Sequence, residues 1–358
     1  TSKSIEENRY MTYSWSTIFK IMKGLTFTAN YNFKHSTTDY MERSTRAKYS
    51  QYPGVEEVAQ ASWFSNKLAQ EYEKSFYHNV DAYLNYDNTF NSHHIYAVAG
   101  KGKDVTVQGG QSKWALLGYF GRIGYDYAGK YLAEFNIRWD ASSRFPKDHR
   151  AGVFPSFAVG YRMSEEAFFD PIRKVFSNFK IRLSTGSLGN QAISDCYPYI
   201  QKLNMQGLGG YLMNGEPVTY AAVSAPPSGK LTWETVIHHN LGLDLGFFDN
   251  RLNLSADLFI RDTKDMLVPG KMLPGVYGAT PPKENAANLR TKGFELAVSW
   301  YDQFNLGNKP FSYNLSFGLS DSKSVITKFD NPMKEFAKSS YYEGMTIGEI
   351  WGYKIDGL

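Results

Sequence analysis

The feature that most constrains this chain is a strict two-residue alternation between positions 119 and 140. From Tyr119 to Tyr127, every second residue is Tyr, Gly or Ile. After the short run A-G-K, the odd positions from 131 to 139 hold Tyr, Ala, Phe, Ile and Trp, whereas the even positions from 134 to 140 hold Glu, Asn, Arg and Asp. Successive side chains of a β-strand point to opposite faces, so the pattern predicts two strands with one apolar, aromatic face and one charged face.

Two architectures can contain such strands. In a soluble sandwich the apolar faces pack together inside and the charged faces meet water. In an outer-membrane barrel the apolar face meets lipid and the charged face lines a wet lumen. Alternation alone does not separate the two architectures, so strand length and the lengths of the connections have to decide.

Extended segments of this kind recur along the whole chain. We expect about twelve of them, each about nine to thirteen residues long, whereas a usual strand has about 5–6 residues. The expected strands are residues 10–21, 25–35, 74–87, 93–100, 114–127, 131–140, 152–162, 179–188, 235–246, 251–264, 290–301 and 311–322. A short helix is expected near residues 55–68, and loops are expected at 101–113, 141–151 and 265–288. The last loop contains Pro269, Pro274, Pro281 and Pro282, residues that exclude regular ladder pairing.

The expected connections alternate between short and long along the chain. Short turns at one rim and long loops at the other are typical of a transmembrane barrel, and a sandwich has no reason to segregate loop length in this way. About 9–11 tilted residues cross a bilayer, which fits these segments. Aromatic residues near the segment ends fit an interfacial girdle; they are Tyr119, Tyr125, Tyr127, Tyr131, Trp139, Phe247, Phe248, Trp300 and Tyr301. The pattern favours an all-β, antiparallel up-and-down transmembrane barrel.

Composition excludes several classes of function. Lys and Arg number 39 and Asp and Glu number 35, a net charge of +4 without a basic block, so nucleic-acid binding is not expected. The single Cys196 excludes an internal disulfide framework and a thiolate metal cluster. No apolar run reaches the roughly 20 residues of a spanning helix. The first residues lack the apolar core of a signal peptide, so we expect either a cytoplasmic protein or a piece of a longer chain. The last eight residues have the pattern of an element that continues, which favours the second alternative.

Several motifs resemble one family, in that family's order. The run Y-F-G-R-I-G-Y-D-Y-A-G-K-Y-L-A-E-F-N-I-R-W-D-A-S-S-R-F-P at 119–146, with G-V-F-P-S-F-A-V-G-Y-R-M-S-E-E at 152–166, is similar to the barrel of SusC-like or RagA-like TonB-dependent outer-membrane transporters. The order continues with F-K-I-R-L-S-T-G-S-L-G-N-Q (179–191), L-T-W-E-T (231–235), N-L-G-L-D-L-G-F-F-D-N-R-L (240–252), R-D-T-K-D-M-L (261–267), N-L-R-T-K-G-F-E-L (288–296) and I-G-E-I-W-G-Y-K-I-D-G-L (347–358). The resemblance covers residues 74–358 well and residues 1–73 loosely.

This resemblance implies a fold, a location and partners. Residues 1–358 would be a fragment of one barrel domain, with about twelve of the roughly 22 strands of a plugged transporter, and with the plug domain and the C-terminal strands absent. Long loops would be extracellular and short turns periplasmic, in the outer membrane of a Bacteroidetes-type bacterium. The whole protein would import oligosaccharides or peptides with a SusD-like surface lipoprotein, driven by TonB through an absent N-terminal segment. The resemblance implies no enzyme activity and no cofactor.

Candidate functional residues follow from the same interpretation. The charged row Arg122, Glu134, Arg138 and Asp140 is expected to line the lumen, either as a network of opposite charges or as a lining that contacts the plug. In the loops, Arg144 could bind a carboxylate and aromatic rings could stack on sugars; these rings are Tyr197, Tyr199, Tyr211, Tyr220 and Trp233. Loop packing or contact with the lipoprotein is the simpler explanation for each of these loop residues.

Two glycine-containing motifs are weak signals for chemistry. The spacing of Gly124, Gly129 and Lys130 is close to a phosphate-binding loop, but Tyr131 follows and the motif lies between two strands, so a hairpin turn at Gly129 is favoured. The run T-G-S-L-G at 185–189 lacks the first Gly of a nucleophile elbow.

Pairs of polar residues are weak signals as well. In His93-His94 and His238-His239 the two rings point to opposite faces of a strand, so neither pair chelates a metal, and no metal site is expected. Glu165-Glu166 lies in a connection and is expected to be solvated charge.

Two other functions stay open at this point. A passive porin or an adhesin would use the same kind of barrel without a plug or TonB. A soluble β-rich module that binds or hydrolyses glycans would fold as a monodisperse monomer in water, whereas a barrel fragment with open edges would aggregate.

Overall fold

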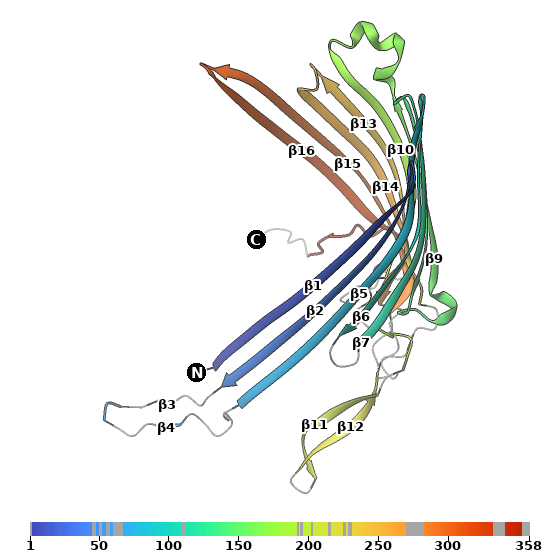
Figure 1. The fold of residues 1–358 in the computed structure, drawn as a ribbon. Coiled ribbons are helices and arrows are strands. Elements are labelled where there is room, and N and C mark those ends of the chain that lie inside the picture. The colour runs from blue at the N-terminus through green and yellow to red at the C-terminus, as the bar shows by residue number, and fades with distance from the viewer. Residues whose placement is uncertain are drawn as a thin grey trace.

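One antiparallel sheet of twelve long strands makes up most of the chain (Figure 1). The structure is a computed structural model and describes residues 2–44, 48–49, 52–54, 58–59, 67–108, 112–191, 193, 196–201, 203–213, 216–224, 227, 231–269, 283–331 and 341–352. The strands are β1 (Ser2–Met22), β2 (Leu25–Ser44), β5 (Lys67–Phe90), β6 (His93–Gln108), β7 (Ser112–Tyr127), β8 (Tyr131–Ser142), β9 (Ala151–Arg162), β10 (Phe176–Asn190), β13 (Glu234–Phe247), β14 (Leu252–Pro269), β15 (Lys283–Leu306) and β16 (Lys309–Lys328). Spatial order follows chain order, so the predicted up-and-down, all-β architecture is confirmed.

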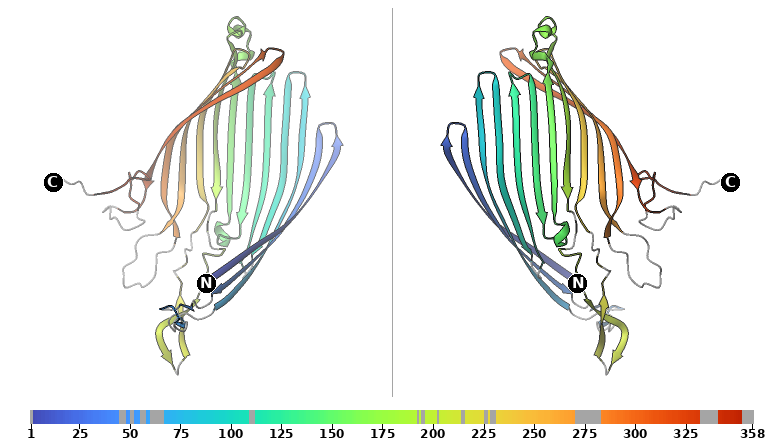
Figure 2. Two further views of the ribbon diagram at one scale, coloured as in Figure 1. Left: turned by 90° about the vertical axis from the view of Figure 1, so that its left-hand side faces the viewer. Right: turned by 90° about the vertical axis from the view of Figure 1, so that its right-hand side faces the viewer.

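The sheet is bent like a section of barrel wall. Figure 1 shows the bend from the edge of the sheet, and Figure 2 shows the strands lying side by side. The two edge strands are β1 and β16, which do not pair with each other in the described part of the chain. The barrel is therefore open along one side.

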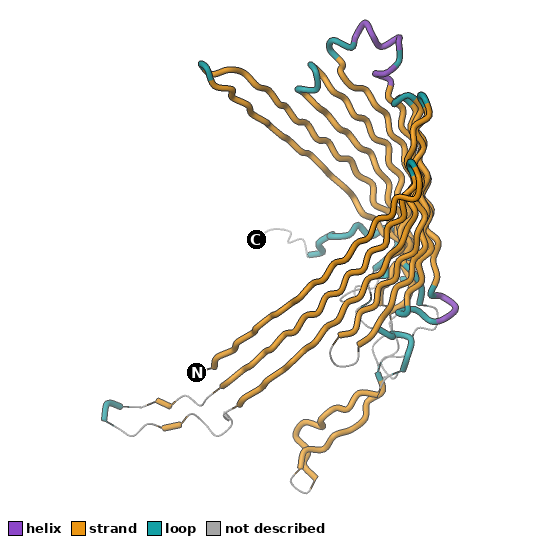
Figure 3. The backbone as a smooth tube through the Cα atoms, in the orientation of Figure 1, coloured by secondary structure: helices purple, strands orange, loops and turns teal. Residues whose placement is uncertain are grey.

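The connections differ in length between the two ends of the sheet (Figure 3). At one end, tight turns join β1 to β2, β5 to β6, β7 to β8, β13 to β14 and β15 to β16. The turn before β2 uses Gly24 at a φ of 79°, a left-handed conformation that costs glycine no steric strain. The remaining connection at this end carries the 3₁₀ helices η2 (Met163–Glu165) and η3 (Ala167–Ile172).

Most connections at the other end are longer. They contain the small hairpins β3 (Lys48–Tyr49) with β4 (Val58–Ala59) and β11 (Leu203–Met213) with β12 (Glu216–Val223), and the 3₁₀ helix η1 (Lys147–His149). Among the described residues, no helix has the length and apolar character needed to cross a membrane.

Two local predictions were wrong, and a third lies mostly outside the described residues. The loop expected at 101–113 is mostly strand, because β6 runs to Gln108 and β7 begins at Ser112. Of the helix expected near 55–68, residues 58–59 and 67–68 belong to β4 and β5, and the others lie outside the described residues. Pro269 is the last residue of β14 and pairs with Lys283, rather than lying in a loop. Proline has no backbone N–H to donate, and the end of a strand tolerates this loss. Pro274, Pro281 and Pro282 lie outside the described residues.

Register gives the sheet two chemically different faces. We call the face that carries Tyr125, Phe135, Ile137 and Leu243 the apolar face, and the face that carries Arg122, Glu134, Arg138 and Asp140 the polar face. On the apolar face, Phe135 and Ile137 are 42% and 40% exposed, so these side chains do not pack inside a protein core. Large exposed apolar side chains on one face suit contact with lipid, as the barrel prediction requires.

Candidate functional site

The polar face carries connected networks of charged and amide side chains. In the β7–β8 region, Glu134 is the centre of one network: the Tyr96 hydroxyl donates to its carboxylate (2.5 Å), and Asn136 Nδ2 donates to its other oxygen (2.9 Å). The Arg122 guanidinium also donates to Glu134 and forms an ion pair with it. The predicted residues Arg122 and Glu134 are thus brought together by the pairing of β7 with β8.

The other two predicted members of the charged row form their own ion pair. Arg138 donates from Nε and Nη2 to the two carboxylate oxygens of Asp140, at 3.1 and 2.9 Å. Asp140 is only 8% exposed, and Gly118 lies opposite it on β7. A Cβ at Gly118 would lie 2.5 Å from Asp140 Oδ1, so the glycine makes room for the carboxylate.

A third network was not predicted from the sequence. Arg182 on β10 donates to Asp244 on β13 (2.7 and 3.0 Å) and to Asp257 on β14 (3.1 Å). Asn240 and Ser255 donate to the same two carboxylates, at 2.6 and 2.9 Å. The signal was present as charged residues at alternate positions of three strands, but only the register of those strands brings them together.

A cluster of buried apolar and aromatic side chains lies at the long-loop end of the polar face. Phe145, Phe154, Ile193, Leu231 and Trp233 form the main buried apolar cluster of the described residues. The Trp233 ring lies 5.2 Å from that of Phe145, and its Nε1 donates to the Arg150 carbonyl (2.7 Å). Trp233 is thus a packed residue with a satisfied indole, and it was predicted only as a loop ring.

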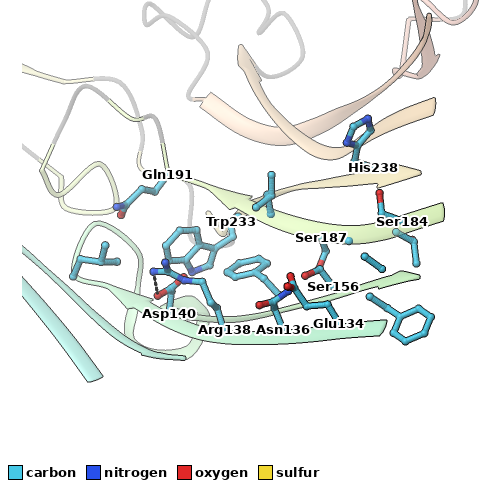
Figure 4. A pocket seen from close by; sticks show the side chains of 18 residues that line it. Glu134, Asn136, Arg138, Asp140, Ser156, Ser184, Ser187, Gln191, Trp233 and His238 are labelled. Atoms are coloured by element: carbon cyan, nitrogen blue, oxygen red, sulfur yellow. Dashed lines mark hydrogen bonds and ion pairs between the residues drawn. The ribbon is translucent and has the colours of Figure 1, made fainter. Parts of the chain in front are cut away.

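A cavity of about 590 Å³ lies between this aromatic cluster and the charged row (Figure 4). Its lining combines apolar residues with many polar groups, among them Glu134, Asn136, Arg138, Asp140, Ser156, Ser184, Ser187, Gln191, Trp233 and His238. Two polar atoms of this lining, Gln191 Oε1 and His238 Nε2, are buried and have no hydrogen-bond partner among the described residues. Unpaired buried polar atoms are costly, so they mark positions where a bound molecule or water gains most.

The predicted loop residues differ in whether their polar groups already bind other parts of the chain. Arg144 donates through Nη1 to the carbonyls of Gln191 (3.4 Å) and Ile193 (2.8 Å), and its guanidinium lies 4.5 Å from the centre of the Trp114 ring. The Tyr197 hydroxyl donates to the Lys113 carbonyl (2.5 Å), and the Tyr199 hydroxyl donates to the Ser143 carbonyl (3.4 Å). These three side chains therefore hold the loops together.

The remaining two tyrosines lie on the hairpin of β11 and β12, which projects from the long-loop end of the sheet (Figure 1). Tyr220 is on β12 and is 43% exposed. Tyr211 is on β11, and its side chain lies outside the described part of the chain.

The connection between β9 and β10 also contains a glutamate, Glu166, that is hydrogen-bonded to other side chains. Glu166 accepts hydrogen bonds from Lys130 Nζ (3.0 Å) and from the Tyr131 hydroxyl (2.9 Å). The hydrogen bond from Lys130 is the main reason why the pKa of Glu166 is lowered. The expectation of a simply solvated Glu165-Glu166 pair is therefore wrong for Glu166, whereas Glu165 is exposed.

The weaker motifs lie in strands and a turn of the sheet. Gly129 lies in the turn between β7 and β8 at a φ of 70°, as the turn interpretation predicts. His238 and His239 pair with Arg261 and Ile260 of β14, on opposite faces. Within the described residues, no group of three or more His, Cys, Asp or Glu side chains is placed to hold a metal ion.

Sequence comparison places a known family over almost the whole chain. The family described as "TonB dependent receptor-like, beta-barrel" matches residues 4–346. TonB-dependent receptor P3 of Formosa agariphila is 26% identical over an alignment that covers 100% of this chain and 38% of that protein. TonB-dependent receptor SusC of Bacteroides thetaiotaomicron is 34% identical over 60% of this chain and 21% of its own length. The chain thus spans well under half of these curated relatives.

Structure comparison finds the same fold in solved transporters. The RagAB peptide importer in its closed-closed state superposes with a TM-score of 0.75 at 18% identity, covering 92% of this chain and 38% of that one. The outer-membrane transporter YddB of Escherichia coli superposes with a TM-score of 0.59 at 9% identity, over 89% of this chain and 42% of that one. At these identities the likeness concerns the fold.

Proposed function

Because this chain belongs to the TonB-dependent receptor-like β-barrel family, whose members lie in the bacterial outer membrane, we propose that it forms part of the wall of a nutrient importer. The observation that carries the proposal is the division of one sheet into two faces. The apolar face exposes Phe135 and Ile137 where lipid would be, and the polar face holds ion pairs and a cavity. In a soluble sandwich the apolar face would be packed inside a core, whereas an exposed apolar face opposite a polar face suits a wall between lipid and a wet lumen.

On this proposal the polar face lines the lumen. Arg122, Glu134, Arg138 and Asp140 would then be lumen residues, with Arg182 and its two aspartates as a second charged group. The first group consists of two balanced ion pairs, whereas the second has one arginine shared by two aspartates and is therefore net negative. The groups proposed to contact the ligand are then the polar atoms of Gln191 and His238, the aromatic rings and the long loops.

The proposed cargo is an oligosaccharide or a peptide. The cavity combines Trp233 and Phe154 with serines, amides and the unpaired atoms of Gln191 and His238, a lining that suits ligands with many hydrogen-bonding groups. Tyr220 on the projecting hairpin presents an exposed ring to such a ligand or to a lid. Arg144, Tyr197 and Tyr199 would support these loops. Tyr211 stays a proposed contact for the ligand or for a SusD-like lipoprotein, and this lipoprotein and TonB are the proposed partners.

Cysteine labelling tests the assignment of the faces. In the complete protein with Cys196→Ser, we compare Glu134→Cys with Phe135→Cys, which are neighbours on β8 but lie on opposite faces. A small water-soluble maleimide is expected to label position 134 and not position 135 in intact outer membranes. Equal labelling at both positions, or labelling only at 135, contradicts the proposed lumen.

An uptake measurement tests the proposed import. Cells that depend on this protein should accumulate a labelled oligosaccharide or peptide only while the proton-motive force is intact. A protonophore should stop uptake, and a strain without TonB should behave like the treated cells. Uptake that continues under both conditions favours the passive porin, which uses the same wall without energy.

A further inference from the structure

The apolar face carries two lysines where lipid-facing strands are expected to be uncharged. Lys101 and Lys103 lie two residues apart on β6, so both point to the apolar face, and both are exposed. Register places Ala82 and Tyr119 on either side of Lys101, and Val80 and Leu117 on either side of Lys103.

Neither lysine has an acidic partner on this face. Among the described residues, no carboxylate oxygen lies within 4.0 Å of either amine, and the nearest acids along the strands point the other way. Asp104 accepts hydrogen bonds from Tyr77 and Asn79 on the polar face (3.1 and 2.7 Å), and Asp81 accepts one from Asn30 (2.7 Å). Two like charges side by side without a counterion are unfavourable, which points to an anion from outside the chain.

Their height on the barrel wall indicates which anion is available. Lys101 and Lys103 stand 101 − 93 = 8 and 103 − 93 = 10 residues beyond the start of β6 at His93. At about 3.3 Å per residue and a tilt near 45°, these positions lie about 19 and 23 Å above the short-turn end of the strand, at the outer margin of an apolar band about 25 Å tall.

Aromatic neighbours mark the same margin. The Lys101 amine lies 5.0 Å from the centre of the Tyr119 ring, and the Tyr119 ring lies 5.6 Å from that of Trp139 on β8. Tyr and Trp prefer the level of lipid headgroups, and an amine over a ring is held in place by the negative face of the ring. Lys101 is thus held beside the aromatic rings that mark this margin.

A second pair of lysines lies on the apolar face at the other side of the sheet, 306 − 292 = 14 residues from the short turn and therefore above the level of Lys101 and Lys103. Lys292 on β15 and Lys323 on β16 are direct cross-strand neighbours on the apolar face, and both are exposed. Phe294 lies two residues from Lys292 on the same face, and Leu319 lies four residues from Lys323. Asp321 also lies on this face, two residues from Lys323, and compensates part of this second charge.

We propose that Lys101 and Lys103 form a site on the outer barrel wall for the phosphate groups of the outer-leaflet lipid. The two amines would bind one anionic headgroup while Leu117, Val80 and Ala82 contact its acyl chains. The inference rests on the barrel fold and its place in the outer membrane, and it does not depend on import or on the cargo.

Native mass spectrometry of the complete protein in a neutral detergent tests this site. The probes are lipid A with its phosphates and lipid A from which the phosphates have been removed. Wild type is expected to retain the phosphorylated form, and Lys101→Gln with Lys103→Gln should weaken that binding by roughly 30-fold, from about one kcal/mol per lysine. Lys101→Arg with Lys103→Arg should keep it.

A control pair removes the same charge away from this site, with Lys20 on the polar face and Lys23 in the β1–β2 turn. Lys20→Gln with Lys23→Gln removes two exposed lysines near the β1–β2 turn and should leave lipid A binding unchanged. Heat-modifiable migration in gels checks that each variant is folded. Where the double variant does not fold, Lys103→Gln alone should weaken binding by roughly fivefold.

Two outcomes would overturn the proposal. One is equal retention of phosphorylated lipid A by wild type and by the folded glutamine variant. The other is equal retention of the two lipid forms by wild type, since a site for acyl chains alone does not distinguish phosphates. Loss of import with intact lipid binding bears on the proposed function and leaves this site in place.

Discussion

Arg182 shows how a single residue can bind three strands of the wall together. Its guanidinium donates to Asp244 and Asp257 from β10, and all three side chains are at most about one-third exposed, at 32%, 28% and 21%. Arg182→Ala leaves two neighbouring carboxylates without their cation, and we expect a loss of about 1–2 kcal/mol in unfolding free energy. Urea unfolding of the detergent-solubilised barrel, followed by gel migration, measures this loss.

The control for Arg182 is an arginine with an equally short but exposed ion pair. Arg9 donates to Glu7 at 2.7 Å, and their side chains are 73% and 55% exposed. Arg9→Ala should give no measurable change, because solvent screens an exposed pair. Equal losses for both variants would contradict the role given to Arg182.

A second residue-scale prediction concerns acid sensitivity of the connection after β9. The pKa of Glu166 is lowered by the hydrogen bond from Lys130, so its contribution to stability is present above the usual carboxyl pKa of about 4.3 and is lost as pH falls through the lowered value. Glu166→Gln should therefore remove part of the decrease in melting temperature between neutral pH and strong acid. Glu165→Gln, which changes the exposed neighbour, should leave the pH profile of the wild type unchanged.

At the scale of elements, glycines on the polar face decide how closely strands and side chains approach. A Cβ at Gly100 of β6 would lie 2.5 Å from Tyr83 Cβ and 2.7 Å from the Ala82 carbonyl oxygen, which cannot move independently of the sheet. We expect Gly100→Ala to cost about 1–3 kcal/mol in urea unfolding. Gly102→Ala is a matched control on the same strand and face, where the nearest atom is 3.8 Å away, and it should be close to neutral.

The same glycines explain part of what the sequence could not reveal. The run G-K-G-K-D at 100–104 has the composition of a loop, yet it continues β6, because Gly100 fits beside Tyr83 and the lysines take the other face. The two faces of β7 and β8 were predictable, since alternation within one hairpin fixes them. The Arg182 network was not, because its partners lie 62 and 75 residues away and depend on registers that no local pattern encodes.

At the scale of the whole molecule, the sheet has two open edges and a broad apolar face. In the described residues, β1 has no partner on its outer side, and β16 is paired there only near its end, where Ser324 and Ile326 hydrogen-bond to residues 344–347. Phe317 and Leu319 on β16 are 62% and 49% exposed. Open edges and exposed apolar faces both promote association in water. Residues 1–358 expressed alone should therefore sediment as polydisperse aggregates in buffer without detergent, whereas a soluble glycan-binding module would give one monodisperse species.

Lysine substitutions on the edge strand separate the two causes of association. Phe317→Lys with Leu319→Lys adds charge to both the edge and the apolar face, whereas Ser316→Lys with Ser320→Lys adds the same charge to the edge and the polar face. If the lipid-facing surface dominates, only the first pair should increase the fraction of small species in sedimentation velocity. Equal effects would mean that open backbone edges drive association, and no association in the unmodified chain would contradict a lipid-facing wall.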